Sequence, residues 1–187
     1  MELAAASALV EGNLDYRSGM FYGSPADLPL GRGLIFTQVR QPIYDVEQHL
    51  FMTVEEPVYI LTHECDVDPA NQRTFRSYLL VCPIIRFEDW LAAYSEDHSD
   101  DELGAFLGNL ATRRVSRVFY LPPLPPLLGY GGLLYFNQIT HTHVSAVSFE
   151  GGNCVAAVTE YGLTKIDHML ENHVLRPKAQ VLSMARW

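Results

Sequence analysis

The chain has 187 residues, 48% of them hydrophobic, and its 13 lysines and arginines against 22 aspartates and glutamates give a formal net charge of −9. This length and hydrophobic content predict a single domain over residues 1–187 with a packed core. The negative charge argues against a protein that neutralises many phosphates over a wide surface.

The sequence shows neither an export signal nor a membrane span. No run of about 18 apolar residues occurs, and the first twelve residues lack the basic segment of a secretory signal. Three cysteines, Cys65, Cys82 and Cys154, are an odd and widely spaced set, which predicts free thiols in a reducing compartment. We therefore expect a cytoplasmic protein.

The first half of the chain predicts strands. Residues 1–30 mix short apolar pieces with Gly and Pro, which indicates an irregular or strand-like arm. The next segments predict a strand in "GLIFTQV", a loop in "RQPIYDVEQH" and a central strand in "EPVYILTHE". A long turn, "DVDPANQRTFRS", then leads to an antiparallel neighbour in "YLLVCPII".

The second half adds helices to these strands. Residues 87–116 predict a helical insertion, because Ser99 and Glu102 have the spacing of a capping box. Strands follow in "RVFYLPP" and "LLYFNQI", and a hairpin is expected around the Gly-Gly turn of "HVSAVSFEGGNCVAAVTEY". An amphipathic helix is expected in "LTKIDHMLENHVL". Together these elements predict a mostly β fold, a small antiparallel barrel or curled sheet with an inserted helical segment and a C-terminal helix.

Four landmarks stand in the same order as in a known family. They are "GRGLIFTQV", "PVYILT" at 57–62, "LLVCP" at 79–83, and "GGLLYFNQI" with Asn137 and Gln138. In this order the chain resembles the MazF/PemK family of bacterial toxins over residues 31–85 and 117–175, with the 1–30 arm and the 87–116 insertion outside. The resemblance implies an SH3-like barrel with a C-terminal helix, a homodimer, an antitoxin-like protein partner and endoribonuclease activity.

Two positions depart from the pattern of that family. Its members carry an arginine before the strand-opening proline and a threonine or serine after the proline of the next strand, where this chain has Glu56 and Ile84. RNA cleavage needs a positive group where charge develops on the phosphate, and a carboxylate at that place adds repulsion. We therefore expect a non-catalytic or regulatory interaction module of bacterial or phage-related origin.

A divergent, metal-independent endoribonuclease is the first alternative. Arg40, Arg73 and Arg76 could supply the cation, and His49 or His63 the acid or base. The competing interpretation is that arginines in such loops are solvated surface charges.

A thiol or metal site is the second alternative. A strand extended through residue 66 would place His63 and Cys65 on one face, where the imidazole could activate the thiol. Together with His141 and His143, which also share a face, the pair could bind zinc tetrahedrally. The tight cysteine pairs of a strong zinc motif are missing, so no cofactor is favoured, and "CDVDP" also suits a polar exit from the sheet.

One basic cluster precedes a predicted strand. Arg113, Arg114 and Arg117, with Phe119 and Tyr120, could bind a short single strand of nucleic acid by charge and stacking. The same arginines could instead stabilise the C-terminal end of the inserted helix. The net charge favours the second interpretation.

Overall fold

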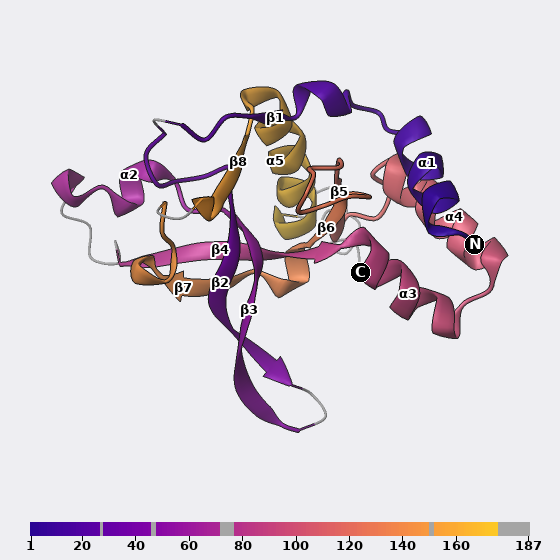
Figure 1. The fold of residues 1–187 in the computed structure, drawn as a ribbon, viewed down its shortest axis with the longest axis horizontal. Coiled ribbons are helices and arrows are strands. Elements are labelled where there is room, and N and C mark those ends of the chain that lie inside the picture. Colours follow the sequence, from indigo (N-terminus) through magenta and orange to yellow (C-terminus); the bar gives the residue numbers. More distant parts are fainter. Residues whose placement is uncertain (27, 46–47, 72–76, 150–151, 176–187) are drawn as a thin grey trace, which may run out of the picture.

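The computed structural model describes residues 1–26, 28–45, 48–71, 77–149 and 152–175 (Figure 1). Its strands pair antiparallel in the order β1-β8-β2-β3-β4-β6-β5, and β7 pairs with β4 off this path. The strands are β1 (Tyr22–Gly23), β2 (Leu34–Asp45), β3 (Leu50–Ile60), β4 (Tyr78–Arg86), β5 (Val118–Leu121), β6 (Gly132–Tyr135), β7 (Thr140–His143) and β8 (Cys154–Val158). The α-helices are α1 (Leu3–Gly12), α2 (Glu64–Val67), α3 (Phe87–Asp97), α4 (Asp100–Ala111) and α5 (Glu160–Leu175).

The sheet is open rather than closed into a barrel. Within the described ranges β1 and β5 are the two ends of this strand order, and no pairing joins them. The predicted barrel closure is therefore wrong, and the fold is mixed α/β with one antiparallel sheet. A helical layer of α1, α3 and α4 covers the β5–β6 end, where Val118, Tyr120 and Leu133 share a hydrophobic cluster with the helices.

Strand β4 joins the parts of the sheet. It pairs with β3 through Val58 and Pro83, with β6 through Ile84 and Leu134, and with β7 through Leu80. Its middle residues are buried on both faces, as the doubly apolar sequence predicts. The predicted pairing of the two apolar strands is confirmed.

The β2–β3 hairpin is longer than the sequence predicts. The segment expected as a loop continues β2 to Asp45, and the strand register shifts between Phe36 and Val39. Beyond this shift β2 pairs with β3 and has no other partner strand among the described residues, so Pro42 is tolerated because one edge needs no ladder donor. Figure 1 shows the hairpin projecting from the body of the protein.

The N-terminal arm is also different from the prediction. Residues Leu3–Gly12 form α1, and Ala6 and Val10 are fully buried in the cluster with α3 and α4. The stretch is rich in alanine, a strong helix former, and the insertion supplies an apolar face on which it packs. Figure 1 shows α1 lying beside α4.

The predicted hairpin around the Gly-Gly turn is wrong, because its first arm continues from the end of β7 into the 3₁₀ helix Val144–Ala146 and forms no strand as far as residue 149. Strand β7 pairs with β4, whereas β8 pairs with β2 and β1. Residues 150 and 151 of that turn lie outside the described residues. Only the second predicted arm forms a strand, and that strand, β8, pairs with strands distant in the sequence because the burial that long-range pairing supplies outweighs a local turn signal.

Helices α3, α4 and α5 agree with the sequence. Ser99 and Glu102 form the predicted capping box of α4, and α5 buries Ile166 and Met169. The hydrogen bonds from Ser99 lower the pKa of the Glu102 carboxyl below its ordinary value. No helix in the described part of the chain is both long and apolar enough to cross a membrane.

Candidate binding groove

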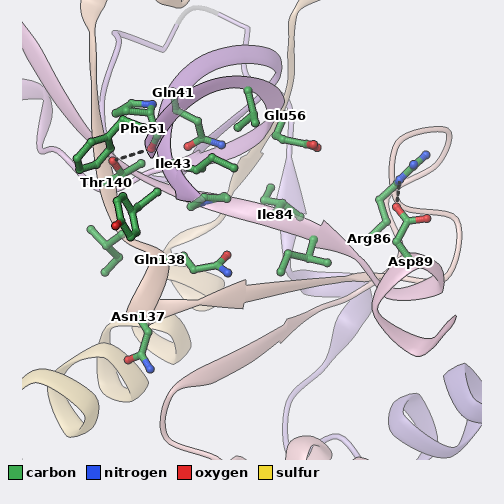
Figure 2. Close-up of a pocket in the computed structure, with 16 residues that line it drawn as sticks. Gln41, Ile43, Phe51, Glu56, Ile84, Arg86, Asp89, Asn137, Gln138 and Thr140 are labelled. Carbon is green, nitrogen blue, oxygen red and sulfur yellow. Dashed lines mark hydrogen bonds and ion pairs between the residues drawn. The ribbon is translucent and has the colours of Figure 1, made fainter. Parts of the chain in front are cut away.

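A cavity of about 580 Å³ lies where the projecting hairpin meets β4 and the β6–β7 connection. We call it the hairpin groove, and Figure 2 shows it. It is lined by Gln41, Pro42, Ile43, Tyr44, Phe51, Val54, Glu56, Pro83, Ile84, Ile85, Arg86, Asp89, Asn137, Gln138, Ile139 and Thr140. Most of these side chains are apolar, which is typical of a binding site that has a few polar groups to orient its ligand.

The landmarks of the sequence resemblance come together here. Glu56 from β3, Ile84 from β4, and Asn137 and Gln138 from the β6–β7 connection all line the groove. In the sequence these residues are spread over positions 56–138. The sheet therefore gathers them at one place, with a carboxylate and an aliphatic side chain at the two positions where the resemblance predicts an arginine and a hydroxyl.

Among the described lining residues Arg86 is the one cation. Its Nε donates to Asp89 Oδ2 at 2.8 Å, and both side chains are about half exposed. Asp89 therefore neutralises much of the positive charge of Arg86, and Glu56 adds a negative charge at the same groove. The groove thus lacks an excess of positive charge for a phosphate.

Gln41 is the polar group that distinguishes this groove. The residue is 1% exposed, and neither Oε1 nor Nε2 has a hydrogen-bond partner in the described structure. The backbone around it is well held, since Thr142 Oγ1 donates to the Arg40 carbonyl at 2.7 Å and Thr140 Oγ1 to the Pro42 carbonyl at 3.4 Å. Buried side-chain amides are normally hydrogen-bonded, so an unpartnered one at a cavity indicates a place for a ligand.

Exposed aromatic side chains flank the groove on the hairpin. The rings of Tyr44 and Phe51 meet edge to face, with centroids 5.2 Å apart. Phe51 is 76% exposed and Tyr44 is 49% exposed. Large apolar side chains that remain in water beside a cavity are characteristic of a surface that binds a partner.

Of the residues predicted for a ribonuclease, the three that the structure describes, Arg40, His49 and His63, do not line this groove. Arg40, on β2, pairs with Glu55 on the solvent side at 3.4 Å. His49 lies at the hairpin turn, where its Nδ1 is 3.5 Å from the Tyr44 hydroxyl, and His63 lies next to α2. Arg73 and Arg76 lie outside the described residues.

The predicted strand through residue 66 ends earlier than expected. Strand β3 stops at Ile60, and His63 caps the short helix α2, its Nδ1 accepting from the Cys65 backbone N–H at 3.3 Å. Alternation therefore does not continue to Cys65. The polar exit from the sheet, the plainer of the two sequence interpretations, describes this segment.

The proposed zinc ligands fall into two separate groups. One ligand atom each from His63, Glu64 and Cys65 lies within 4.8 Å of the others, a small solvent-exposed cluster. His141 and His143 project from β7, and both rings contact Tyr78 instead. In the part of the chain that is described, these two histidines do not join the first group, so the four-residue site is not assembled.

The basic cluster before β5 does not form a stacking platform. Phe119 and Tyr120 are buried in the core, at 1% and 2% exposure, and so cannot stack on a base. Arg113 donates from Nε to Asp15 Oδ2 at 2.9 Å. The predicted stacking of bases on these two rings is therefore wrong, because both aromatic side chains belong to the core.

The three cysteines are free thiols, as predicted. Cys65 is exposed, whereas burial raises the pKa of the Cys82 thiol to about 12 and that of Cys154 to about 11. The two raised values make thiolate chemistry unfavourable at those positions near neutral pH.

The sequence did not single out Gln41 or Phe51. Both lie in or beside the stretch expected as a polar loop, where the pattern of aromatic and β-branched residues around Pro42 was the available signal for a strand.

Comparisons with protein-family models, with curated proteins and with solved structures returned no match for this chain.

Proposed function

We propose that this protein is an interaction module on a MazF/PemK toxin-like scaffold, and that its hairpin groove binds an extended segment of a partner protein. The observation that carries the proposal is the buried Gln41 amide, which has no partner among the described residues although it lines a cavity. The apolar lining and the exposed Phe51 ring offer surface that a partner side chain can cover.

The charge of the groove supports a protein partner over RNA. Arg86 is paired with Asp89, and Glu56 occupies the place where the family carries its cleavage arginine. A phosphate backbone entering here would meet an uncompensated carboxylate, in a chain whose formal net charge is −9. An uncharged polypeptide backbone meets no such repulsion.

The scaffold assignment is part of the same proposal. It is supported by the convergence of Glu56, Ile84, Asn137 and Gln138 on one groove and by the antiparallel sheet followed by a C-terminal helix. On this view the family barrel has opened to accept the helical layer, and the protein forms a homodimer in the cytoplasm. Sedimentation velocity measures the dimer directly, and a monomer at micromolar concentration contradicts this part of the proposal.

Selection from a random peptide display library tests the binding function. Peptides enriched on the wild-type protein are measured against Phe51→Arg and against the control Val174→Arg. Both changes put a charge at an exposed apolar position, at 76% and 64% exposure, but Val174 lies on α5 outside the groove. We expect Phe51→Arg to weaken binding by about tenfold or more and Val174→Arg to leave it unchanged.

Two results would contradict the proposal. One is a library that yields no enriched peptide, and the other is equal binding by the wild type and Phe51→Arg. Incubation with mixed RNA tests the nuclease alternative, for which we expect no cleavage. Cleavage that disappears in an Arg40→Ala, Arg73→Ala, Arg76→Ala variant would replace our proposal with that alternative.

A further inference from the structure

The Gln41 amide has a specific hydrogen-bonding capacity that the described residues leave unused. Its Oε1 accepts and its Nε2 donates, side by side in one plane. Leaving both unpaired at 1% exposure disfavours the folded state, because the amide has lost water without gaining a protein partner. A ligand that supplies an adjacent donor and acceptor removes this penalty on binding.

The groove holds this amide in place. Gln41 lies in β2 opposite Val54 of β3, and the carbonyls on both sides of it accept from the threonines of β7. The strand is thus fixed from two directions, while the side chain stays unpaired. Figure 2 shows Gln41 among the groove residues, with its amide turned toward the side of Ile84 and Gln138.

Two biological groups present a donor and an acceptor side by side. One is a nucleobase edge, which a side-chain amide can bind in a bidentate manner. The other is a single residue of an extended peptide, whose N–H and C=O point to the same side of the strand and can both be exchanged with one partner. Glu56 and the neutralised Arg86 disfavour the phosphates that accompany a base, so the peptide is the better match.

We infer that Gln41 is the residue of the hairpin groove that recognises the main chain of the bound segment: its Nε2 donates to the C=O and its Oε1 accepts from the N–H of one extended residue. This inference rests on the proposed function and deepens it. The apolar side chains of Pro42, Val54 and Ile84 lie at the same cavity and take the flanking side chains of the segment. Because Gln41 is only 1% exposed, the bound segment must displace part of the lining over the amide.

The test uses a minimal extended residue as the probe, so it requires no selected peptide. N-acetyl-leucine N′-methylamide is titrated into the ¹⁵N-labelled protein, and the Gln41 side-chain NH₂ signals, assigned by their absence from Gln41→Met, are followed by NMR. The matched probe is N-acetyl-N-methyl-leucine N′-methylamide, which lacks the one N–H that Oε1 is expected to accept.

We expect the first probe to shift the Gln41 signals in a saturable manner and the N-methyl probe to bind about threefold to tenfold more weakly. In Gln41→Met, backbone signals of the groove should report equal affinity for both probes. The inference is overturned if the Gln41 signals do not move, if both probes shift them equally, or if adenosine shifts them and N-acetyl-leucine N′-methylamide does not.

These outcomes separate the inference from the proposed function. If selected peptides bind the wild type but not Phe51→Arg, and the Gln41 signals do not respond to the probe, the proposed binding function stands and the role of the Gln41 amide is rejected. If the Gln41 signals shift saturably and only with the probe that carries the N–H, but the library yields no peptide, the pairing of the Gln41 amide stands and the proposed binding of a partner protein is rejected.

Discussion

Replacing Gln41 with methionine should stabilise the free protein. Methionine has nearly the same length and volume as glutamine, so the change keeps the packing and removes the two polar atoms that lack partners in the described structure. Most substitutions at a site that is 1% exposed lower stability, and a gain is the unusual outcome that this structure predicts. A binding residue often carries such a cost to folding.

The magnitude follows from the buried amide. A buried donor or acceptor without a partner costs roughly 1–3 kcal/mol, so we expect Gln41→Met to raise the free energy of unfolding by roughly 1–3 kcal/mol. For a chain of this length each kcal/mol corresponds to a Tm increase of about 2–4 °C. The same substitution should abolish the discrimination between the two dipeptide probes.

Urea denaturation of the wild type, Gln41→Met and a matched control, Thr142→Val, measures the effect. Thr142 is also a buried polar residue, at 5% exposure, but its hydroxyl donates to the Arg40 carbonyl at 2.7 Å. The free energy of unfolding of the Thr142→Val control should therefore fall by about 1 kcal/mol. If Gln41→Met leaves the urea midpoint unchanged or lowers it at constant m-value, the amide is satisfied in solution and the reasoning fails.

Three further predictions concern the scaffold. Gly131→Ala should destabilise the protein by roughly 2–4 kcal/mol, because φ is +94° and a Cβ would lie 2.7 Å from the Leu121 carbonyl oxygen. The control Gly129→Ala, with open space around it, should be nearly neutral in the same thermal melts. Similar Tm losses for both variants would contradict this prediction. Ser99→Ala should cost about 1 kcal/mol by removing the N-cap of α4, and unchanged stability in urea would show that the cap contributes nothing. Cys65 should react with a thiol reagent at pH 8 in the native protein while Cys82, whose pKa burial raises to about 12, reacts only after unfolding; equal rates by mass spectrometry would refute the burial of Cys82.

Local signals in the sequence predicted the elements whose interactions are local. The capping box of Ser99 and Glu102 needs two residues three positions apart, and the periodicity of α5 lies within one helix, so both could be derived without knowing their partners. The doubly apolar stretches at residues 58–60 of β3 and in the middle of β4 were recognisable for a similar reason, since a strand segment buried on both faces has few other places in a fold.

The groove could be predicted only in part. The resemblance placed Glu56 and Ile84 at one functional position, and the structure brings them to one cavity. It did not predict Gln41, because whether a side-chain amide has a partner depends on residues far away in the sequence. The zinc hypothesis was limited in the same way, since the proximity of His63 and His141 depended on which strands pair.

The sequence by itself determined the apolar strands, the helical insertion, the terminal helix and the acidic charge that disfavours broad binding of RNA. Tertiary structure decided that the N-terminal segment is a helix packed against α4, that β7 pairs with β4 and β8 with β2, and that the sheet stays open. Those outcomes depend on contacts between residues distant in the chain, whose burial outweighs local propensity. The unpaired amide of Gln41 exists only because these long-range contacts surround it with residues that do not bond to it.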